Sequence, residues 1–439
     1  MFGSDGFRRY LRNTSWLFLE RMVRLVVVLA TGIYVARYLG DSLFGQLNYA
    51  TGFVGLFFAL TTMGLDEIIV RDLVKRPDKR DELLGTAAVI KLMGALLLVG
   101  LVLTATWVRD MEHLTASLII IIACAEVLRP LSVIDYHFMA NVKADMTVRV
   151  QLAQVLFSAA LKVLLVLLQA PLIWFAWVYV AENLALSLGY MLAYRSDGTS
   201  LRTWRYTSTM ARYLLAESWP LIIFGIALHV QARIDQVMLG DMLGSTLGEE
   251  EGYAEVGQYS VALKMIEALG FLPVIVQKSL APAITRAKVR DETLYADRLL
   301  NQYRLMFAMF LVTAVPLYFL AEPMIVLLYG REFAPAGYLL SLFAIRLFFT
   351  NMGVAKTSFI TNESLFKYSL FTAVVGAALN IGMNYFLIPP LKAIGAIWAT
   401  IGSFLVSIFL LDLLFRETRA NFRWMLKGIA TFWMVRRAE

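Results

Sequence analysis

Long apolar runs recur along almost the whole chain, and they constrain its fold more than any other feature. A helix needs about 20 mostly apolar residues to cross the hydrocarbon core of a bilayer. Only 17% of the residues are charged, against about 25% in an average soluble protein. An all-α polytopic membrane protein with about twelve transmembrane helices is therefore predicted. The predicted spans are 14–38, 44–68, 83–107, 114–137, 150–169, 171–194, 217–240, 256–281, 301–321, 323–353, 366–388 and 393–415.

The tenth predicted span is the least regular. Tyr329 to Glu332 and Pro335 interrupt its two apolar pieces. We expect a short helix or a re-entrant turn before the full span, because irregular backbone at membrane depth needs protein or a wet cavity around it.

Basic residues alternate between the connections of these spans. One set of alternate connections holds 27 Lys and Arg residues, whereas the other set holds only Arg109 and Lys392. Since short cytoplasmic loops are rich in Lys and Arg, both termini are predicted to be cytoplasmic and the number of spans to be even. This topology largely explains the net charge of +7. We therefore expect membrane lipids as the partner of these loops, and no nucleic acid.

Two short motifs occur twice in the same order. The segment Leu-Gly-Asp at 39–41 recurs at 239–241, and Phe-Gly-Gln at 44–46 is answered by Val-Gly-Gln at 256–258. Six predicted spans separate the copies, so both halves have the same orientation, as in a parallel repeat about an axis along the membrane normal.

This repeat predicts two six-helix lobes around a central cavity. The first predicted domain, 1–210, is the N-terminal lobe with a basic inter-lobe linker, Arg195 to Arg212. The second, 211–439, is the C-terminal lobe with a cytoplasmic tail that we expect to form an interfacial helix.

Besides the basic residues counted with the connections, eleven more lie inside the predicted spans. A charge that faces lipid at mid-membrane costs at least about 2.5–3.5 kcal/mol, so buried charges should face protein or water. Basic groups equal or exceed acidic groups even at depth, as expected of a cavity that attracts an anion. For any single residue the alternative stays open that it only neutralises a neighbour, as Glu20 and Arg24 could at i,i+4 spacing.

Arginine suits a phosphate-bearing head group, because its planar fork binds phosphate oxygens bidentately and keeps its charge. Arg24 and Arg233, on the first helix of each lobe, are the main predicted contacts to such a head group. The secondary predicted contacts are Lys264, Arg129 and Lys91. Candidate coupling residues for a proton or a sodium ion are Asp235, Glu267 and Glu182. Further polar groups of the predicted cavity are Glu20, Asn48 and His229, while Asn183, Asn380 and Asn384 are expected to hydrogen-bond between helices or to sugars.

Signatures of catalysis are missing from the sequence. It contains no P-loop, no GxSxG elbow and no HExxH helix. Its single cysteine, Cys124, lies in an apolar run, which excludes a disulfide framework. We therefore expect a transporter and no enzyme, without catalytic residues, metal ligands or any cofactor other than a coupling proton or sodium ion.

Several segments together resemble a known family. The run from Ile33 to Asp41, followed by Phe44 to Ala50, resembles the start of O-antigen and other polysaccharide flippases of the multidrug/oligosaccharidyl-lipid/polysaccharide exporter superfamily. Gly64 to Leu73 and Leu327 to Ala336 are similar to segments of the same family. In such families helices one, two, seven and eight line the cavity, which would favour Arg24, Arg233, Asp235 and Lys264.

The resemblance implies a flippase of the bacterial inner membrane that works by alternating access. Its substrate would be an undecaprenyl-pyrophosphate-linked oligosaccharide, moved from the cytoplasmic to the periplasmic leaflet for lipopolysaccharide or another surface polysaccharide. Polysaccharide polymerase and chain-length machinery would be its protein partners. Scattered polar contacts recognise sugars without a sequence code, so O-antigen, capsule and exopolysaccharide units all stay open.

Other functions stay open as alternatives. A lipid II-type or teichoic-type flippase resembles this family, although the lipid II branch usually carries fourteen spans. An ion-coupled multidrug exporter of the same superfamily would favour an acidic cavity for organic cations. A membrane glycosyltransferase or polymerase would need a sizeable extramembrane loop, and the predicted outer loops are short.

Overall fold

The computed structural model describes the backbone of residues 5–435 and most side chains from residue 15 onward. The side chains of Arg8, Arg9 and Arg12, which contribute to the predicted basic bias, lie outside the described residues. Across the described range the regular elements are all helical, without a strand. The prediction of an all-α fold is confirmed.

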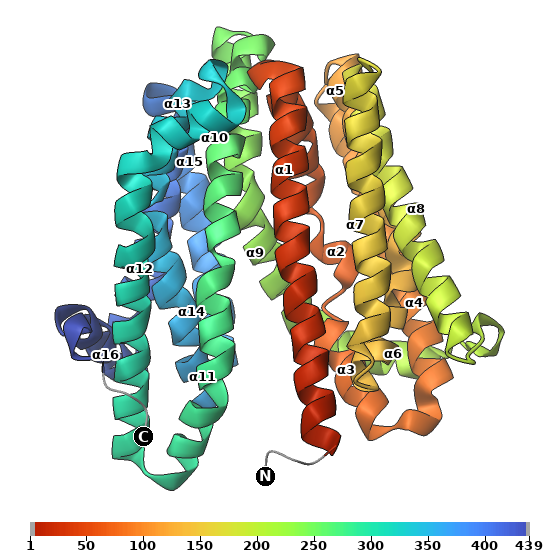
Figure 1. The fold of residues 1–439 in the computed structure, drawn as a ribbon, viewed down its shortest axis with the longest axis vertical. Helices are drawn as coiled ribbons and strands as arrows, with labels where there is room; N and C mark the ends of the chain where they lie inside the picture. The colour runs from red at the N-terminus through yellow and green to blue at the C-terminus, as the bar shows by residue number, and fades with distance from the viewer. Residues whose placement is uncertain (1–4, 436–439) are drawn as a thin grey trace. The chain divides into compact units, whose positions relative to one another are not determined.

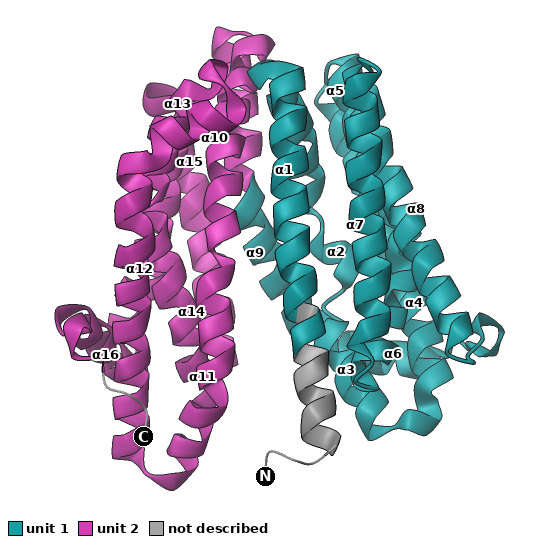
Figure 2. Cartoon of the chain, viewed as in Figure 1, with its two compact units in different colours: residues 1–233 teal, residues 234–439 magenta. Residues whose placement is uncertain are grey.

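The chain divides into two compact units, Met1–Arg233 and Ile234–Glu439 (Figure 2). Within each unit the long helices run side by side (Figure 1). Unit 1 contains α1 (Asp5–Leu56), α2 (Ala59–Thr62), α3 (Asp66–Lys75), α4 (Arg80–Val108), α5 (His113–Ala125), α6 (Val133–Ala140), α7 (Ala144–Leu167), α8 (Leu172–Ser196) and most of α9 (Ser208–Leu247). Unit 2 contains the end of α9, α10 (Glu249–Leu269), α11 (Phe271–Arg290), α12 (Glu292–Tyr329), α13 (Ala334–Phe343), α14 (Arg346–Asn362), α15 (Phe366–Phe404) and α16 (Arg419–Ala430). The units divide within α9, whereas the predicted lobes divide near residue 210.

Nine helical segments of the described chain are long and apolar enough to cross a membrane, and a pair bent by 45°, Arg331–Phe343 with Arg346–Asn362, makes up to ten. Two of these segments fold back on themselves. Gly40 (φ 72°, ψ 177°) interrupts α1, and Arg24 and Thr51 on its two sides line one cavity, although a straight helix would separate them by about 40 Å.

The second folded segment is α15. Pro389 and Pro390 lie inside it, and Lys392 is non-helical (φ 51°, ψ −134°). The backbone of Leu387 leaves no room for a Cβ at Gly395, although eight residues of straight helix would span about 12 Å. Counting both arms of α1 and of α15 gives the twelve segments that the sequence predicts.

The second and tenth spans differ from their predicted limits. Instead of one helix over 44–68, the chain breaks at Met63 and Gly64, both with positive φ. A Cβ on Gly64 would lie 2.8 Å from the Cβ of Leu221, so close packing against α9 requires glycine here. The predicted 323–353 span instead starts after Gly330 (φ 102°), where α12 ends, and its bend confirms the expected irregularity.

Equivalent contacts in the two units support the internal repeat. Gln46 donates to Thr115 Oγ1 (2.9 Å) and Glu112 Oε2 (3.1 Å) at the start of α5. Gln258 donates to the carbonyl of Glu332 (2.9 Å) and accepts from the backbone amide of Ala336 (3.1 Å) at the start of α13. The repeated glutamine therefore fixes the start of the corresponding helix in each unit.

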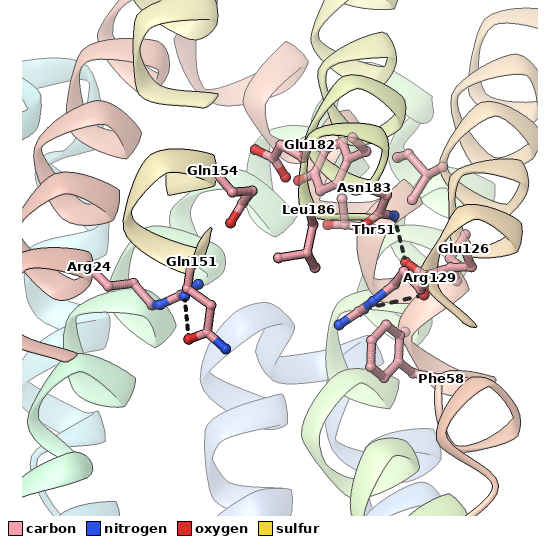
Figure 3. Close-up of a pocket in the computed structure, with 14 residues that line it drawn as sticks. Arg24, Thr51, Phe58, Glu126, Arg129, Gln151, Gln154, Glu182, Asn183 and Leu186 are labelled. Carbon is pink, nitrogen blue, oxygen red and sulfur yellow. Dashed lines mark hydrogen bonds and ion pairs between the residues drawn. The ribbon is translucent and has the colours of Figure 1, made fainter. Parts of the chain in front are cut away.

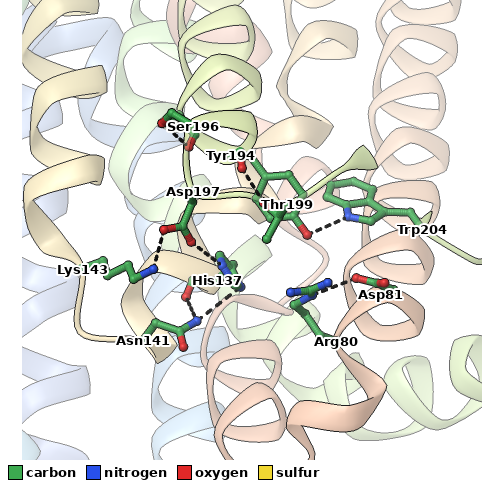
Figure 4. Close-up of polar contacts among 11 residues, drawn as sticks. Arg80, Asp81, His137, Asn141, Lys143, Tyr194, Ser196, Asp197, Thr199 and Trp204 are labelled. Carbon is green, nitrogen blue, oxygen red and sulfur yellow. Dashed lines mark hydrogen bonds and ion pairs between the residues drawn. The ribbon is translucent and has the colours of Figure 1, made fainter. Parts of the chain in front are cut away.

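The predicted inter-lobe linker is fastened to unit 1. The backbone amide of Arg205 donates to the carbonyl of Asp81 (3.1 Å), and Trp204 Nε1 donates to the hydroxyl of Tyr194 (3.1 Å). Asp197 accepts hydrogen bonds from Lys143 and from His137 (Figure 4). Burial opposes the charge of Asp197, but these two bonds outweigh it and lower the pKa of its carboxyl. The linker thus forms part of unit 1.

Candidate functional site

A cavity of about 370 Å³ lies within unit 1. Five stretches of chain contribute most of its lining: the two arms of α1, the 3₁₀ segment Glu126–Ser132 after α5, the middle of α7 and the middle of α8. Figure 3 shows Arg24 and Arg129 on different sides of this cavity. Its lining residues are Arg24, Thr51, Val54, Gly55, Phe58, Ile122, Glu126, Arg129, Gln151, Gln154, Tyr179, Glu182, Asn183 and Leu186.

Arg24 is held on the α1 side of the cavity. Its Nε donates to Glu20 one turn earlier, and its Nη2 donates to Gln151 Oε1 of α7 (3.2 Å). The amide of Gln151 is fixed in turn, because its Nε2 donates to the hydroxyl of Tyr190 (2.9 Å). About a third of the Arg24 side chain, 37%, stays exposed. Its guanidinium is therefore oriented and still accessible from the cavity.

Arg129 occupies the opposite side. Pro130 interrupts regular helix after α5, so this stretch is 3₁₀ and turns the arginine toward the cavity. Its Nη1 donates to Glu126 Oε2 (3.3 Å), and its guanidinium lies 4.6 Å from the ring centre of Phe58. Cation–π contact of this kind favours a fixed guanidinium plane. Asn183 donates to Glu126 Oε1 (3.4 Å) and steadies the carboxylate.

Glu182 is the third predicted site residue in the cavity. It accepts hydrogen bonds from Lys162 Nζ (2.7 Å) and from Ser158, both on α7. Its charge is thus already compensated within unit 1, as burial of a carboxylate demands.

The charges that line this cavity balance. Two guanidiniums, Arg24 and Arg129, face two carboxylates, Glu126 and Glu182. The sequence predicts that basic groups equal or exceed acidic groups at depth, and in this lining the two kinds are equal in number. Charges enclosed by apolar helices need partners of opposite sign. The i,i+3 spacing places Glu126 beside Arg129 as such a partner.

The other predicted residues of unit 1 lie around the cavity or away from it. Lys91 is buried, donates to the hydroxyl of Tyr136 (2.7 Å) and ties α4 to α6. Asn48 donates to the carbonyl of Phe44 (2.6 Å) in its own helix. His229 packs its ring 5.4 Å from that of Phe58. The Cγ of Arg233 would lie 3.2 Å from a Cβ on Gly55. His229 and Arg233 therefore support the wall of the cavity, while Lys91 and Asn48 serve packing.

Unit 2 carries a buried carboxylate of a different kind. Asp235 is 3% exposed and accepts three hydrogen bonds from neutral groups. The donors are the hydroxyl of Tyr259 (2.6 Å), the hydroxyl of Thr400 (2.5 Å) and Nδ2 of Asn384 (2.7 Å). Asn384 and Thr400 meet on it because α15 folds back at Lys392.

Two asparagines of α15, one of them a donor to Asp235, keep unused hydrogen-bonding atoms. Among the side chains that the structure describes, Asn384 Oδ1 and both polar atoms of Asn380 are buried without a hydrogen-bond partner. Such orphaned oxygens are costly in a protein interior. The sequence analysis identified Asp235 and both asparagines but missed Tyr259 and Thr400. The prolines between the arms of α15 are the only local sign that Thr400 could approach Asp235. Lys264 and Glu267, one turn apart on α10, are not among the side chains that bond Asp235.

Fold and site together define a multi-pass membrane protein with the fold of transporters of the multidrug/oligosaccharidyl-lipid/polysaccharide exporter superfamily. The chain resembles an inward-facing multidrug resistance MATE transporter of that superfamily, with a TM-score of 0.71 and 14% identity over 97% of this chain and 100% of that one. It resembles the lipid II flippase MurJ, inward closed, with a TM-score of 0.66 and 12% identity over 96% and 92%. The eukaryotic MATE transporter AtDTX14 gives a TM-score of 0.59 and 13% identity over 96% and 100%.

The family is shown by sequence as well. A family model described as polysaccharide biosynthesis protein matches residues 10–288, more than half of the chain. The chain therefore belongs to this family of polysaccharide biosynthesis proteins, and the predicted family is confirmed. None of the curated proteins matches it. With the fold, this membership defines a flippase-type transporter of the superfamily.

Proposed function

We propose that this protein moves undecaprenyl-pyrophosphate-linked oligosaccharide repeat units from the cytoplasmic to the periplasmic leaflet of the bacterial inner membrane, for surface polysaccharide biosynthesis. One observation carries the proposal: a single cavity among apolar helices holds two accessible guanidiniums, Arg24 and Arg129, in a polysaccharide biosynthesis family. The basic residues of alternate connections support cytoplasmic termini for such a transporter.

The cavity offers separate chemistry for phosphate and for sugar. Arginine forks bind phosphate oxygens in pairs, while the amides of Gln154 and Asn183 can bond to sugar hydroxyls. Phe58 and Tyr179 supply flat apolar faces beside these groups. Alternating access would open the cavity first to the cytoplasm and then to the periplasm, while the polyprenyl tail stays in lipid. Lys264, the other predicted head-group residue, lies on α10 of unit 2.

We further propose that Asp235 binds the coupling proton or sodium ion. The support is chemical: a buried carboxylate, the Thr400 hydroxyl and the unused amide oxygen of Asn384 are oxygen groups of the kind that hard cations favour. Of the other predicted coupling residues, Glu182 is already bonded to Lys162, and Glu267 is exposed on α10. Asp235 therefore has the strongest claim.

A lipid II-type flippase is the second candidate function. The likeness to the lipid II flippase MurJ over 96% of this chain favours it. The likeness to MATE transporters favours a multidrug exporter in the same way. Both likenesses are below 15% identity and carry the fold alone. The match to a polysaccharide biosynthesis family supports the oligosaccharide substrate over both alternatives.

The direct test is genetic. The gene is deleted alone in its host, and lipids and surface polysaccharide are analysed together. The proposal expects loss of the surface polymer with single lipid-linked repeat units retained in the cytoplasmic leaflet, and their sugars name the substrate. Unchanged polymer and intermediates, in a host without a second flippase, would contradict it. Pull-down of the polymerase and chain-length proteins with the tagged transporter tests the proposed partners.

A further inference from the structure

Each cavity arginine is engaged by a carboxylate of its own chain segment. Glu20 precedes Arg24 by one turn and is buried, 7% exposed. Glu126 precedes Arg129 by three residues and is equally buried, with Oε2 3.3 Å from the Arg129 Nη1. The two pairs lie on different elements, so the same arrangement is built twice around one cavity.

These ion pairs stabilise the two arginines when no substrate is bound. A guanidinium enclosed by apolar helices without a partner is costly, and each carboxylate removes that cost. The same guanidinium N–H groups are those that a pyrophosphate would use. An incoming pyrophosphate must therefore compete with Glu20 and Glu126 for these donors.

The surroundings of Glu126 allow it to give way. Its other oxygen, Oε1, accepts from Nδ2 of Asn183 (3.4 Å), so the carboxylate keeps a hydrogen-bond donor when the arginine turns to a ligand. The guanidinium carbon of Arg129 also lies 4.6 Å from the ring centre of Phe58, so the arginine keeps a cation–π contact while its hydrogen-bond partner changes.

We propose that Glu20 and Glu126 are displaceable counter-ligands: they hold Arg24 and Arg129 in the empty cavity, yield them to the pyrophosphate on loading and recover them on release. The inference rests on the proposed function and deepens it. Both glutamates are positioning residues that set the affinity and the release rate of the head group through the arginines. Purely structural ion pairs would instead affect stability and leave affinity unchanged.

The test measures binding and turnover separately. Purified full-length protein in lipid nanodiscs is titrated with sugar-free undecaprenyl pyrophosphate, and export of lipid-linked repeat units is measured in the deletion strain. E20Q and E126Q should each bind the probe about tenfold more tightly, the equivalent of one charge-assisted hydrogen bond removed from competition. Turnover should fall in both, because release then lacks the returning carboxylate.

Two control variants separate displacement from general electrostatics. E182Q removes a carboxylate from the same cavity whose partners are Lys162 and Ser158. E217Q removes one that pairs with Arg71 outside the cavity lining. The inference expects a smaller gain for E182Q than for E126Q and no change for E217Q. An equal gain for E182Q would mean a field effect and would overturn it.

The remaining outcomes are also decisive. If the wild type binds the probe and R24A weakens binding, but E20Q and E126Q leave affinity unchanged or lower it, the inference fails while the proposed function stands. If the wild type does not bind the probe, both fail. If E126Q does not fold, E20Q provides the same comparison. E126D can also replace E126Q: it keeps the charge on a shorter side chain, and its affinity for the probe should lie between those of the wild type and E20Q.

Discussion

The cavity of unit 1 and the Asp235 site of unit 2 stabilise charged side chains in opposite ways. Unit 1 surrounds a cavity with guanidinium–carboxylate pairs, whereas unit 2 surrounds the single carboxylate of Asp235 with neutral donors. In the register of the repeated Leu-Gly-Asp, Asp235 corresponds to Val35, and Arg24 corresponds to Phe224. The repeat thus provides the same scaffold twice, while the charged residues at these positions differ between the two copies.

The largest expected effect comes from the cavity arginines. The double variant R24A/R129A should lower transport by roughly a hundredfold or more, because it removes two charged hydrogen-bonding partners of the head group. R24A alone should already fail to restore surface polymer in the deletion strain. R233A, whose arginine packs against the cavity wall at Gly55 and is not among the lining residues, should cause a smaller loss. Membrane abundance of each variant is the control, and wild-type transport in R24A and R233A alike would refute the head-group assignment.

The counterpart in unit 2 is Asp235. D235N should change how transport depends on the pH or sodium gradient, since an amide cannot take up the proton and lacks the negative charge that attracts a cation. T400V, which removes one hydroxyl bonded to the carboxylate (2.5 Å), should shift the dependence less. Export is measured across imposed gradients. An unaltered gradient dependence in D235N would remove Asp235 as the coupling site.

A second buried carboxylate of unit 2 should behave differently. Asp412 is fully buried and bonds to Lys356, Tyr368 and Asn421. K356M should lower stability by about 3–5 kcal/mol, because it leaves a buried charge without its cation, and it should leave the affinity for undecaprenyl pyrophosphate unchanged. Thermal unfolding in detergent measures the loss. The double variant K356M/D412N should recover part of it; no recovery would show that the two residues do not act as a pair.

The smallest expected effect concerns the fastened linker of unit 1. The folded-state pKa of Asp197 lies below its ordinary value of 3.8, so its stabilising contribution is present above that value and is lost as the pH falls through the folded-state pKa. D197N should therefore lower the melting temperature near neutral pH and flatten its decline in acid below about pH 4. D78N, at an exposed aspartate, is the matched control. An unchanged acid profile in D197N would contradict this anchoring role.

The sequence revealed the spans more completely than the site. Hydropathy and the repeated glutamine motif predicted twelve segments and their duplication, because both depend on local residue patterns. The broken second span was not predictable, since Gly64 adopts its conformation to meet Leu221, far away in the chain. Arg24, Arg129 and Glu182 were all proposed, but their balance with Glu126 depends on how α1, α7 and α8 meet.

Asp235 of unit 2 shows the same difference between what local sequence and tertiary structure reveal. Asp235 stands out in the sequence as an acidic residue within an apolar run, and this local signal is enough to propose it. Its donors Tyr259 and Thr400 are ordinary residues of other helices. Only the reversal of α15 at Lys392 brings Thr400 to it, and this tertiary relation has no local signature.

The central claim is that the cavity of unit 1 receives a pyrophosphate-linked sugar. Its most direct test reconstitutes the protein in liposomes that contain a lipid-linked pyrophosphate disaccharide, and measures how much of that lipid becomes accessible to an added pyrophosphatase. The account expects accessibility to rise beyond one leaflet with the wild type and to stay at one leaflet with R24A/R129A. Equal translocation by both proteins would contradict it.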